Sequence, residues 1–528
     1  MKMRIVKIMM MAVAMVSLLP SCVNDLSPQN LGSQVKNSSN VYNTPADYLS
    51  GLAKVYASFA LSGQYGPAGS SDIAGLDEGF GVYLRVLWNA EELTTDEAVI
   101  AWNDQTIKNF HWQTWTPSDV FNAALYSRIM YTVTIANEFI RQSAKSTDAN
   151  VKIYNAEARF CRALAYWHAL NLYGNPPFVT EADLPGAFYP KQTTPSALFT
   201  YIDNELKAIA PLLPAPLTPG GADYGHATQG AVYMLQAKLY LNAEVYLGAG
   251  NGKYTECLTA LNNLIAFTQY SLATNYLQNF AADNYQSPEL IFTINYDGNR
   301  SQSYGGMDYI LHAEVGGSMN PANFGLGGGW AGLRTTSGLV NKFAIPVSGP
   351  DARAQFYTAG QSLVINDIGN FNDGYAIQKF TNLTSTGGPS ASGNLNFVDT
   401  DYPMFRLADA YLMYAEAVLR GGTGGDNTTA LGYVNQVLTR AYGDATGNIT
   451  AAQLTLPWLL DERARELYWE GHRRTDLIRF GQFTNGTYQW PWKGNVPNGQ
   501  ATDAHLNLFP IPSTDLSANP TLKQNAGY

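Results

Sequence analysis

Apolar and polar residues alternate along much of this chain with the spacing of amphipathic α-helices. From Tyr48 to Phe59 the apolar side chains recur every three or four residues, which gathers them on one face of a helix. The pattern therefore predicts a mainly helical protein. Further helices are expected over residues 118–145, 151–173, 195–212, 228–247, 253–268, 404–420, 428–442 and 455–480.

Two long stretches, residues 62–117 and 274–403, lack this period and are rich in Gly, Asn and Tyr. Loops of such length in a compact protein usually carry function. A few short strands are expected inside them, for example from Leu290 to Asn295. We therefore expect a helical scaffold whose two irregular insertions form a recognition face. The scaffold segments would be about 45–62, 118–268 and 404–480.

The segment from Leu459 to Gly481 is far more charged than the rest of the chain. Ten of its 23 residues are Asp, Glu or Arg, whereas the whole chain is 14% charged. Opposite charges at these spacings can pair with neighbours on one helix, and the interleaved apolar residues would bury that helix. We expect a structural clamp, in which Glu470, His472 and Asp476 are held among arginines and do not serve as a catalytic group.

The N-terminus has the organisation of a signal peptide. Lys2, Arg4 and Lys7 precede an apolar run over residues 8–19, which is too short to span a bilayer. Residues 1–21 are therefore expected to be the signal peptide. Residues 22–44 are polar and aperiodic, as in a flexible tether, and 45–528 would form a single domain. No later stretch holds about twenty consecutive apolar residues.

Composition narrows the possible functions. The net charge of −10 argues against nucleic acid as a partner, because phosphate binding needs a basic surface. The six histidines show no metal-ligand spacing. The 33 Tyr, 22 Phe and 10 Trp suit either an aromatic core or a surface that stacks on uncharged ligands. Cys161 and Cys257 are expected to be buried free thiols, although a disulfide stays possible.

Several segments resemble the SusD-like (RagB/SusD) family of Bacteroidetes outer-membrane glycan-binding lipoproteins. They are residues 157–166 with 171–177, 406–417, 459–481, and 508–513 with 519–520 and 524–528. The resemblance implies a scaffold of tetratricopeptide-like helix pairs with long irregular insertions and a few short strands. It also implies a non-catalytic protein that binds a polysaccharide beside a SusC-like TonB-dependent transporter. No cofactor is expected. A structural calcium stays open, since no contiguous calcium loop appears.

The residues around Cys22 resemble a lipobox, in which the cysteine is the lipid attachment site. Asn24 and Asp25 follow it, and an acidic residue there resembles the signal that sends such lipoproteins to the cell surface. The resemblance thus implies a lipid-anchored protein of the outer membrane that faces the extracellular side.

The candidate site residues follow from similarity to the starch-binding founder of the family. Trp102, Tyr304 and Trp330 match its sugar-stacking aromatics, and Asp77 and Arg85 match polar residues near its bound glucan. Gln105 stands where the founder has Asn, and Ile100 where it has another Trp. Gln can still donate and accept, but its reach differs. The resemblance implies an α-glucan such as starch or a maltooligosaccharide. The two departures keep another neutral glycan, such as a fructan, open.

Two other functions stay possible. A glycoside hydrolase needs only two carboxylates, whose separation the sequence does not reveal. Candidates for them cluster in an aromatic-rich region: Asp72, Asp77, Glu78, Glu91, Glu92, Asp96 and Glu97. A protein-interaction module, whose helix pairs hold a protein partner without any role for sugar, is the third hypothesis.

Overall fold

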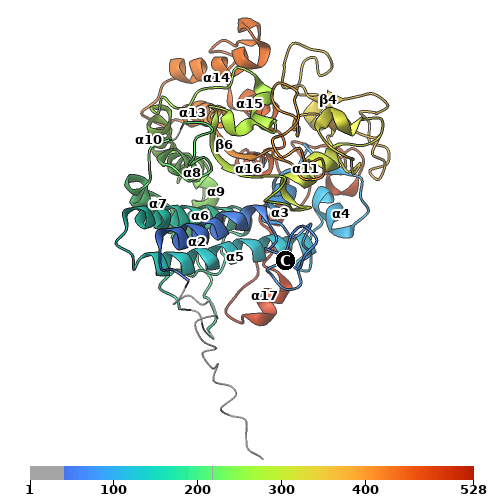
Figure 1. Ribbon diagram of the computed structural model, residues 1–528. Coiled ribbons are helices and arrows are strands. Elements are labelled where there is room, and N and C mark those ends of the chain that lie inside the picture. The colour runs from blue at the N-terminus through green and yellow to red at the C-terminus, as the bar shows by residue number, and fades with distance from the viewer. Residues whose placement is uncertain (1–40, 185, 187, 217) are drawn as a thin grey trace, which may run out of the picture.

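The computed structural model describes residues 41–528 apart from 185, 187 and 217. The expected signal peptide, Cys22 and most of the expected tether lie outside these residues. Helices dominate the described part (Figure 1), so the mainly α fold class is confirmed. That residues 45–528 form one domain stays a prediction. Among the residues described, no helix is both long enough and apolar enough to cross a membrane.

Three long helices, α2 (Pro45–Ala60), α5 (Val120–Ser143) and α6 (Ala149–Tyr173), lie side by side in the lower half of Figure 1. Each begins at a side chain that accepts hydrogen bonds from the first free amides, namely Thr44, Asp119 and Asp148. Such caps satisfy donors that the helix itself cannot. The predicted helices 118–145 and 151–173 are confirmed.

The remaining scaffold helices stack as neighbouring pairs. In chain order they are α7 (Pro195–Ile209), α8 (Gln229–Leu241), α9 (Ala243–Leu247), α10 (Tyr254–Ile265), α13 (Leu407–Leu419) and α14 (Asn427–Tyr442). α7 packs on α6, α8 on α10, α10 on α13, and α13 on α14. This succession agrees with the expected helix pairs. The helix predicted over 228–247 is interrupted at Asn242.

Short antiparallel strand pairs connect distant parts of the chain. β2 (Leu290–Ile294), the strand expected there, pairs with β6 (Tyr402–Arg406). β6 takes the place of the first residues of the helix predicted over 404–420. β4 (Phe356–Tyr357) pairs with β5 (Ala376–Ile377). β1 (Val99–Ile100) pairs with β3 (Leu333–Arg334) and so joins the two insertions.

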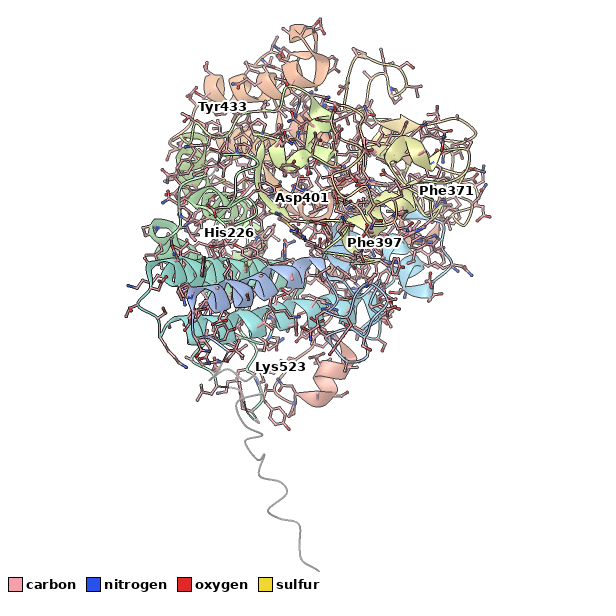
Figure 2. The ribbon with its side chains drawn as sticks, in the orientation of Figure 1. His226, Phe371, Phe397, Asp401, Tyr433 and Lys523 are labelled. Atoms are coloured by element: carbon pink, nitrogen blue, oxygen red, sulfur yellow. The ribbon has the colours of Figure 1, made fainter. Side chains whose placement is uncertain are left out.

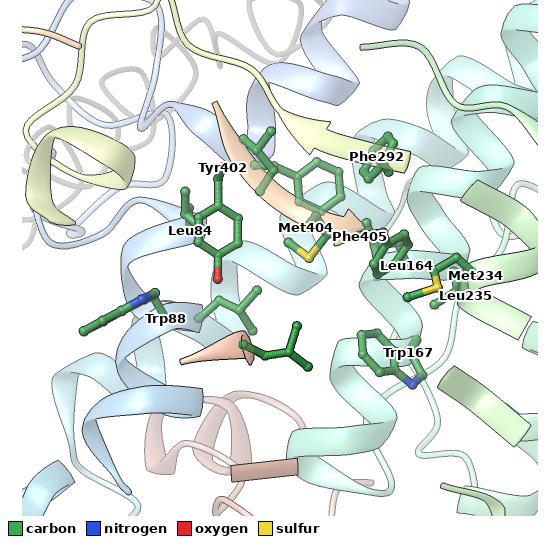
Figure 3. Close-up of a cluster of buried hydrophobic side chains, with 14 of the residues drawn as sticks. Leu84, Trp88, Leu164, Trp167, Met234, Leu235, Phe292, Tyr402, Met404 and Phe405 are labelled. Atoms are coloured by element: carbon green, nitrogen blue, oxygen red, sulfur yellow. The ribbon is translucent and has the colours of Figure 1, made fainter. Parts of the chain in front are cut away.

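The core lies where β2 and β6 cross the scaffold helices. Figure 3 shows buried side chains from both strands: Phe292 and Phe405 lie on the side of Leu164 and Met234, and Tyr402 lies on the side of Trp88. Burial of these large apolar groups is the main source of folding free energy. Cys161 and Cys257 are buried and unpaired, which confirms two free thiols.

The insertions hold more helix than expected. The residues predicted as loops include α3 (Tyr83–Trp88), the π-helical turn η2 (Asn89–Leu93), α4 (Gln105–Trp112), α11 (Gly306–Glu314) and α12 (Ser337–Val340). All residues of α11 and most of α3 are buried, so neither presents the polar face that marks an amphipathic helix.

The other helical elements of the described residues are short. They are η3 (Ala210–Leu212), η4 (Tyr276–Phe280), η5 (Asn284–Gln286), η6 (Pro321–Phe324), η7 (Ala445–Gly447), η8 (Lys493–Asn495), η9 (Ala504–Asn507) and α17 (Ser513–Ala518).

The helix predicted over 455–480 is wrong, because the structure has two helices there. α15 (Leu456–Leu467) and α16 (Arg473–Arg479) flank a turn over residues 468–472, here called the clamp turn. Trp469 and Gly471 in this turn have φ values of 65° and 75°, which an α-helix does not allow. The buried indole of Trp469 donates to the backbone oxygen of Glu97 at 2.9 Å.

The charges of this segment form buried ion pairs, as expected, but mostly with distant partners. Only a few, such as Arg465 with Glu462, join neighbours on one helix. Glu470 instead pairs with Lys379 and Arg406 at 2.6 and 2.5 Å. Other pairs are Arg353–Glu462, Arg406–Glu466, Arg463–Asp409, Arg463–Asp476, Arg473–Asp96 and Arg479–Glu416. The segment thus ties the scaffold to both insertions.

Candidate functional site

The rings of Trp102 and Trp330 lie together although 228 residues separate them. Trp102 follows β1 and Trp330 precedes β3, so the antiparallel pairing of these two strands brings both to one end of the ladder. Their ring centroids are 6.4 Å apart, with 42° between the planes. The Trp102 indole N–H donates to the Trp330 backbone oxygen at 3.1 Å. Both side chains are partly exposed.

Tyr304 provides a third ring at the turn before α11. It is 41% exposed, and its ring centroid lies 5.4 Å from that of Phe397. Figure 2 labels Phe397 beside the region of α3 and α11. Phe397 was not predicted from the sequence, because one Phe in a Gly/Asn-rich stretch carries no pattern.

Arg85 connects these rings. Its guanidinium carbon lies 4.2 Å from the ring centroid of Tyr309 and 5.7 Å from that of Trp102, distances typical of cation–π contacts. Its Nη1 also donates to the backbone oxygen of Tyr304 at 3.4 Å. Burial lowers the pKa of Arg85, although guanidinium remains charged in proteins. One side chain therefore contacts both parts of the aromatic cluster formed by Trp102, Trp330 and Tyr304.

Asp77 lies at the edge of this cluster, beside Gly79, Tyr304 and Arg85, whereas Gln105 contacts its own helix. Asp77 is exposed, and its Oδ1 accepts from the backbone amides of Gly79 and Phe80, each at 2.8 Å. It thereby closes the turn before α3. Gln105 is exposed at the start of α4 and donates to Asn109 at 2.8 Å, along its own helix and not toward the rings. Ile100 is 1% exposed within β1, so it adds nothing to the surface.

His312 packs against one face of the Trp330 ring and was not predicted from the sequence. The two rings are stacked, with centroids 4.8 Å apart and 17° between planes. Its Nδ1 lies 2.7 Å from the backbone oxygen of Gly328, and its Nε2 lies 3.1 Å from that of Asn396. His312 thus joins the loop of Trp330 to the loop of Phe397. Burial lowers the pKa of His312, which favours the neutral imidazole with one N–H donor.

The carboxylates that could suit a hydrolase have structural partners. Asp72 pairs with Lys54 and Arg128, and Asp96 is bound by Arg473 at 2.7 Å. Although burial opposes ionisation of Asp96, this arginine brings its pKa to about 2.

Three further acidic residues are buried around the clamp segment. Glu91 accepts from Thr475, Glu92 from the amides of Gly471 and His472, and Glu97 from the amide of Trp469. These contacts favour a role in holding the clamp over a role in catalysis. The described residues contain no group of three or more His, Cys, Asp or Glu side chains placed to hold a metal ion.

Comparison with known proteins places the chain in a family. A family model described as "SusD family" matches residues 351–528, and one described as "Starch-binding associating with outer membrane" matches residues 82–241. The chain is similar to the starch-binding protein SusD of Bacteroides thetaiotaomicron, at 34% identity over 96% of each chain. A SusD-like protein of Formosa agariphila is 28% identical over 76% of this chain and 78% of its own.

Solved structures agree on the fold. A SusD homologue from Bacteroides thetaiotaomicron superposes with a TM-score of 0.71 at 19% identity, covering 93% of this chain and 98% of its own. With a relative above 30% identity along nearly the whole of both chains, the chain belongs to the SusD family.

Proposed function

We propose that this protein binds a neutral polysaccharide at the cell surface and passes it to a SusC-like TonB-dependent transporter without cleaving it. The polysaccharide is starch or another α-glucan. A lipid on Cys22 holds the protein on the extracellular side of the outer membrane. The 34% identical relative named as starch-binding supports the choice of glycan.

The observation that carries this proposal is the convergence of Trp102, Trp330 and Tyr304 around Arg85. Sugar rings present C–H faces that lie well on indole and phenol rings, while their hydroxyls exchange hydrogen bonds with polar neighbours. In this proposal Asp77 and Arg85 exchange such hydrogen bonds with the sugar, and Gln105 does so only if its side chain turns away from Asn109.

Simple energetics sets the strength of such a site. Three rings that each cover roughly 100 Å² of sugar, at about 25 cal/mol per Å², contribute about 7 kcal/mol in total. Association and ordering of the glycan remove much of this gain. Binding of short oligosaccharides should therefore be weak, and long polymers should be retained better through repeated contacts.

A different neutral glycan is the second candidate. Ile100 is buried in β1, so the aromatic cluster has one ring fewer than the sugar-stacking group of the starch-binding founder. Gln105 has a different reach from Asn. Both differences change how a curved glucan would be supported, and they make a fructan or another glucan the alternative ligand.

Affinity electrophoresis in gels that contain soluble starch tests the proposal. We expect Trp330→Ala and Tyr304→Ala each to weaken retention about ten-fold, the effect of losing about 1.4 kcal/mol. Tyr189→Ala is the matched control, because Tyr189 is 58% exposed and the backbone oxygen of the next residue, Pro190, accepts from Asn519 near the C-terminus. Equal retention of all four proteins would move the site elsewhere.

The rival functions need separate assays. A hydrolase would release reducing sugar from a glycan that binds, whereas we expect none. An interaction module without a sugar role would bind no glycan on an array and still co-purify with an outer-membrane barrel.

A further inference from the structure

A second polar and aromatic cleft lies apart from the aromatic cluster. It has a volume of about 590 Å³ and lies between the segments around residues 224, 285, 295–301 and 391–401. Its lining includes Tyr224, Tyr285, Asn295, Asp297, Arg300 and Ser392. Nothing in the ion-pair network or the proposed site uses these side chains.

Two tyrosines form its apolar surface. The rings of Tyr224 and Tyr285 have centroids 6.1 Å apart and planes inclined by 63°, and both are half-buried. The Tyr224 hydroxyl donates to the buried Asp401 at 2.8 Å, and Asp401 also accepts from the Tyr296 amide at 2.7 Å. These contacts hold the Tyr224 ring in place without a ligand.

The polar groups of the cleft have hydrogen-bonding capacity to spare. The Arg300 side chain is 88% exposed and lies 3.8 Å from Asp297. Asn295 is exposed, and its amide oxygen accepts from Thr293 at 2.6 Å, which leaves its N–H donors for a ligand. Two inclined rings with amide, guanidinium and carboxylate groups between them suit an uncharged, hydroxyl-rich molecule better than an apolar one.

The adjoining cavity has a different character. It is about 260 Å³ in volume, lies beside His226 and is lined mainly by apolar residues of α2. It shares Tyr224 and Asn295 with the polar cleft. Its apolar lining distinguishes this cavity from the polar cleft.

Two chain segments connect the lining of the cleft to the aromatic cluster. Ser301 lies three residues before Tyr304, so their Cα atoms are at most about 11 Å apart. Ser392 precedes Phe397 by five residues. The two segments touch, because Asn394 donates to the Gly298 backbone oxygen at 2.8 Å. A Cβ on Gly298 would lie only 2.4 Å from the Phe397 oxygen. Figure 2 shows Asp401 between His226 and Phe397.

We propose that this cleft is a second carbohydrate subsite, which holds the continuation of a polysaccharide whose other part lies on the aromatic cluster. The inference rests on the proposed function and specifies, in addition, that the ligand must be long enough to reach both sites. Oligosaccharides that cover only the aromatic cluster would not reach Tyr285, whereas long chains would occupy both sites and gain from their linkage.

Calorimetry with a length series of maltooligosaccharides and with soluble starch tests this inference. The variants are Tyr285→Ala and Arg300→Ala, with Tyr189→Ala as the control and thermal melting to verify folding. We expect both cleft variants to bind a trisaccharide like the wild type and to bind the longest chains about three- to ten-fold more weakly. Arg300→Ala keeps the test valid if Tyr285→Ala fails to fold, because the Arg300 side chain is exposed.

Failure of the inference and failure of the proposed function give different results. Wild-type affinity of folded cleft variants for every chain length, together with weak binding by Trp330→Ala, would overturn the second subsite alone. A wild-type protein that binds none of these glycans would overturn the proposed α-glucan ligand and the subsite with it.

Discussion

His312 shows how a residue that need not touch the ligand can shape a binding surface. Its ring lies flat against Trp330, and its two nitrogens face the backbone oxygens of Gly328 and Asn396. The Trp330 amide in turn donates to the His312 oxygen at 2.7 Å. One face of the Trp330 ring is therefore covered by His312, while the side chain remains partly exposed.

We predict that His312→Ala weakens retention in starch gels about ten-fold, because the Trp330 ring loses its support. His312→Gln should recover part of the retention, since its amide can still donate to one of the two oxygens. Affinity electrophoresis measures both. Full retention by His312→Ala would show that Trp330 needs no support from this ring.

The same side chain predicts a pH dependence. Because burial lowers the pKa of His312 below its unfolded value of about 6.5, its contribution to stability is present above that pH and is lost as the pH falls further. The free energy of unfolding of the wild type, minus that of His312→Gln, should therefore decrease between pH 7.5 and 5. Urea denaturation at several pH values measures this difference. A constant difference would contradict the prediction.

Among single residues, the sequence suggested most members of the candidate site but not their contacts. Similarity pointed to Trp102, Tyr304, Trp330, Asp77 and Arg85, and the structure brings these residues to one region. The contacts of His312, Tyr309 and Phe397 were not predictable, since they join residues far apart in the chain through two-residue strands too short to leave a pattern. At the two positions that differ from the founder, Gln105 donates along its own helix and Ile100 is buried in β1.

Among the elements, the clamp turn departs most from what the sequence predicts. Its charges and apolar residues fit one continuous helix, yet hydrogen bonds to Glu92 and Glu97 of the first insertion stabilise a turn there. The carboxylate of Glu92 accepts the amides of Gly471 and His472, and Glu97 accepts the indole and amide of Trp469. A lone glycine inside a helical pattern can lie within a helix or end it, and no residue type predicts the positive φ of Trp469. The spacing of the residues therefore could not reveal this break.

The ion pair between Arg473 and Asp96 fastens the clamp to the first insertion. Both side chains are buried, and removal of one partner from such a pair typically costs about 3–5 kcal/mol, because the other charge is left buried. We predict a loss of this size for Arg473→Met, measured by urea unfolding. Arg300→Met, at an exposed position, is the control and should change stability by less than about 0.5 kcal/mol. Equal stability of the two variants would mean that Asp96 is satisfied without Arg473.

The clamp also predicts a loss of stability at high pH. Burial raises the pKa of Glu97 to about 7, and that of its neighbour Glu92 is raised as well. Since the folded pKa of Glu97 exceeds the unfolded value of about 4.5, its favourable contribution is fully present below about pH 4.5. That contribution is lost as the pH rises through about 7.

Comparison of the wild type with Glu97→Gln isolates this effect. The free energy of unfolding of the wild type should fall relative to the variant between pH 5 and pH 8. If the two proteins keep a constant difference over this range, the Glu97 carboxyl does not hold its proton in the folded state.

On the scale of the whole molecule, the binding face depends on contacts between distant segments. The helical scaffold follows from periodicity, and the family resemblance implied its tetratricopeptide-like helix pairs. The two insertions are joined by β1 and β3, and the first is fastened to the C-terminal part by Asp96 and Arg473. Such long-range contacts bring Trp102 and Trp330 together and place Arg85 between Trp102 and the Tyr304 backbone, without the support of a continuous sheet.

A crystal structure of this protein with a bound maltooligosaccharide would show where the glycan binds. We expect sugar rings lying on Trp102, Trp330 and Tyr304, with hydroxyls within hydrogen-bond distance of Arg85 or Asp77. A sugar bound elsewhere, with these three rings uncovered, would contradict this expectation.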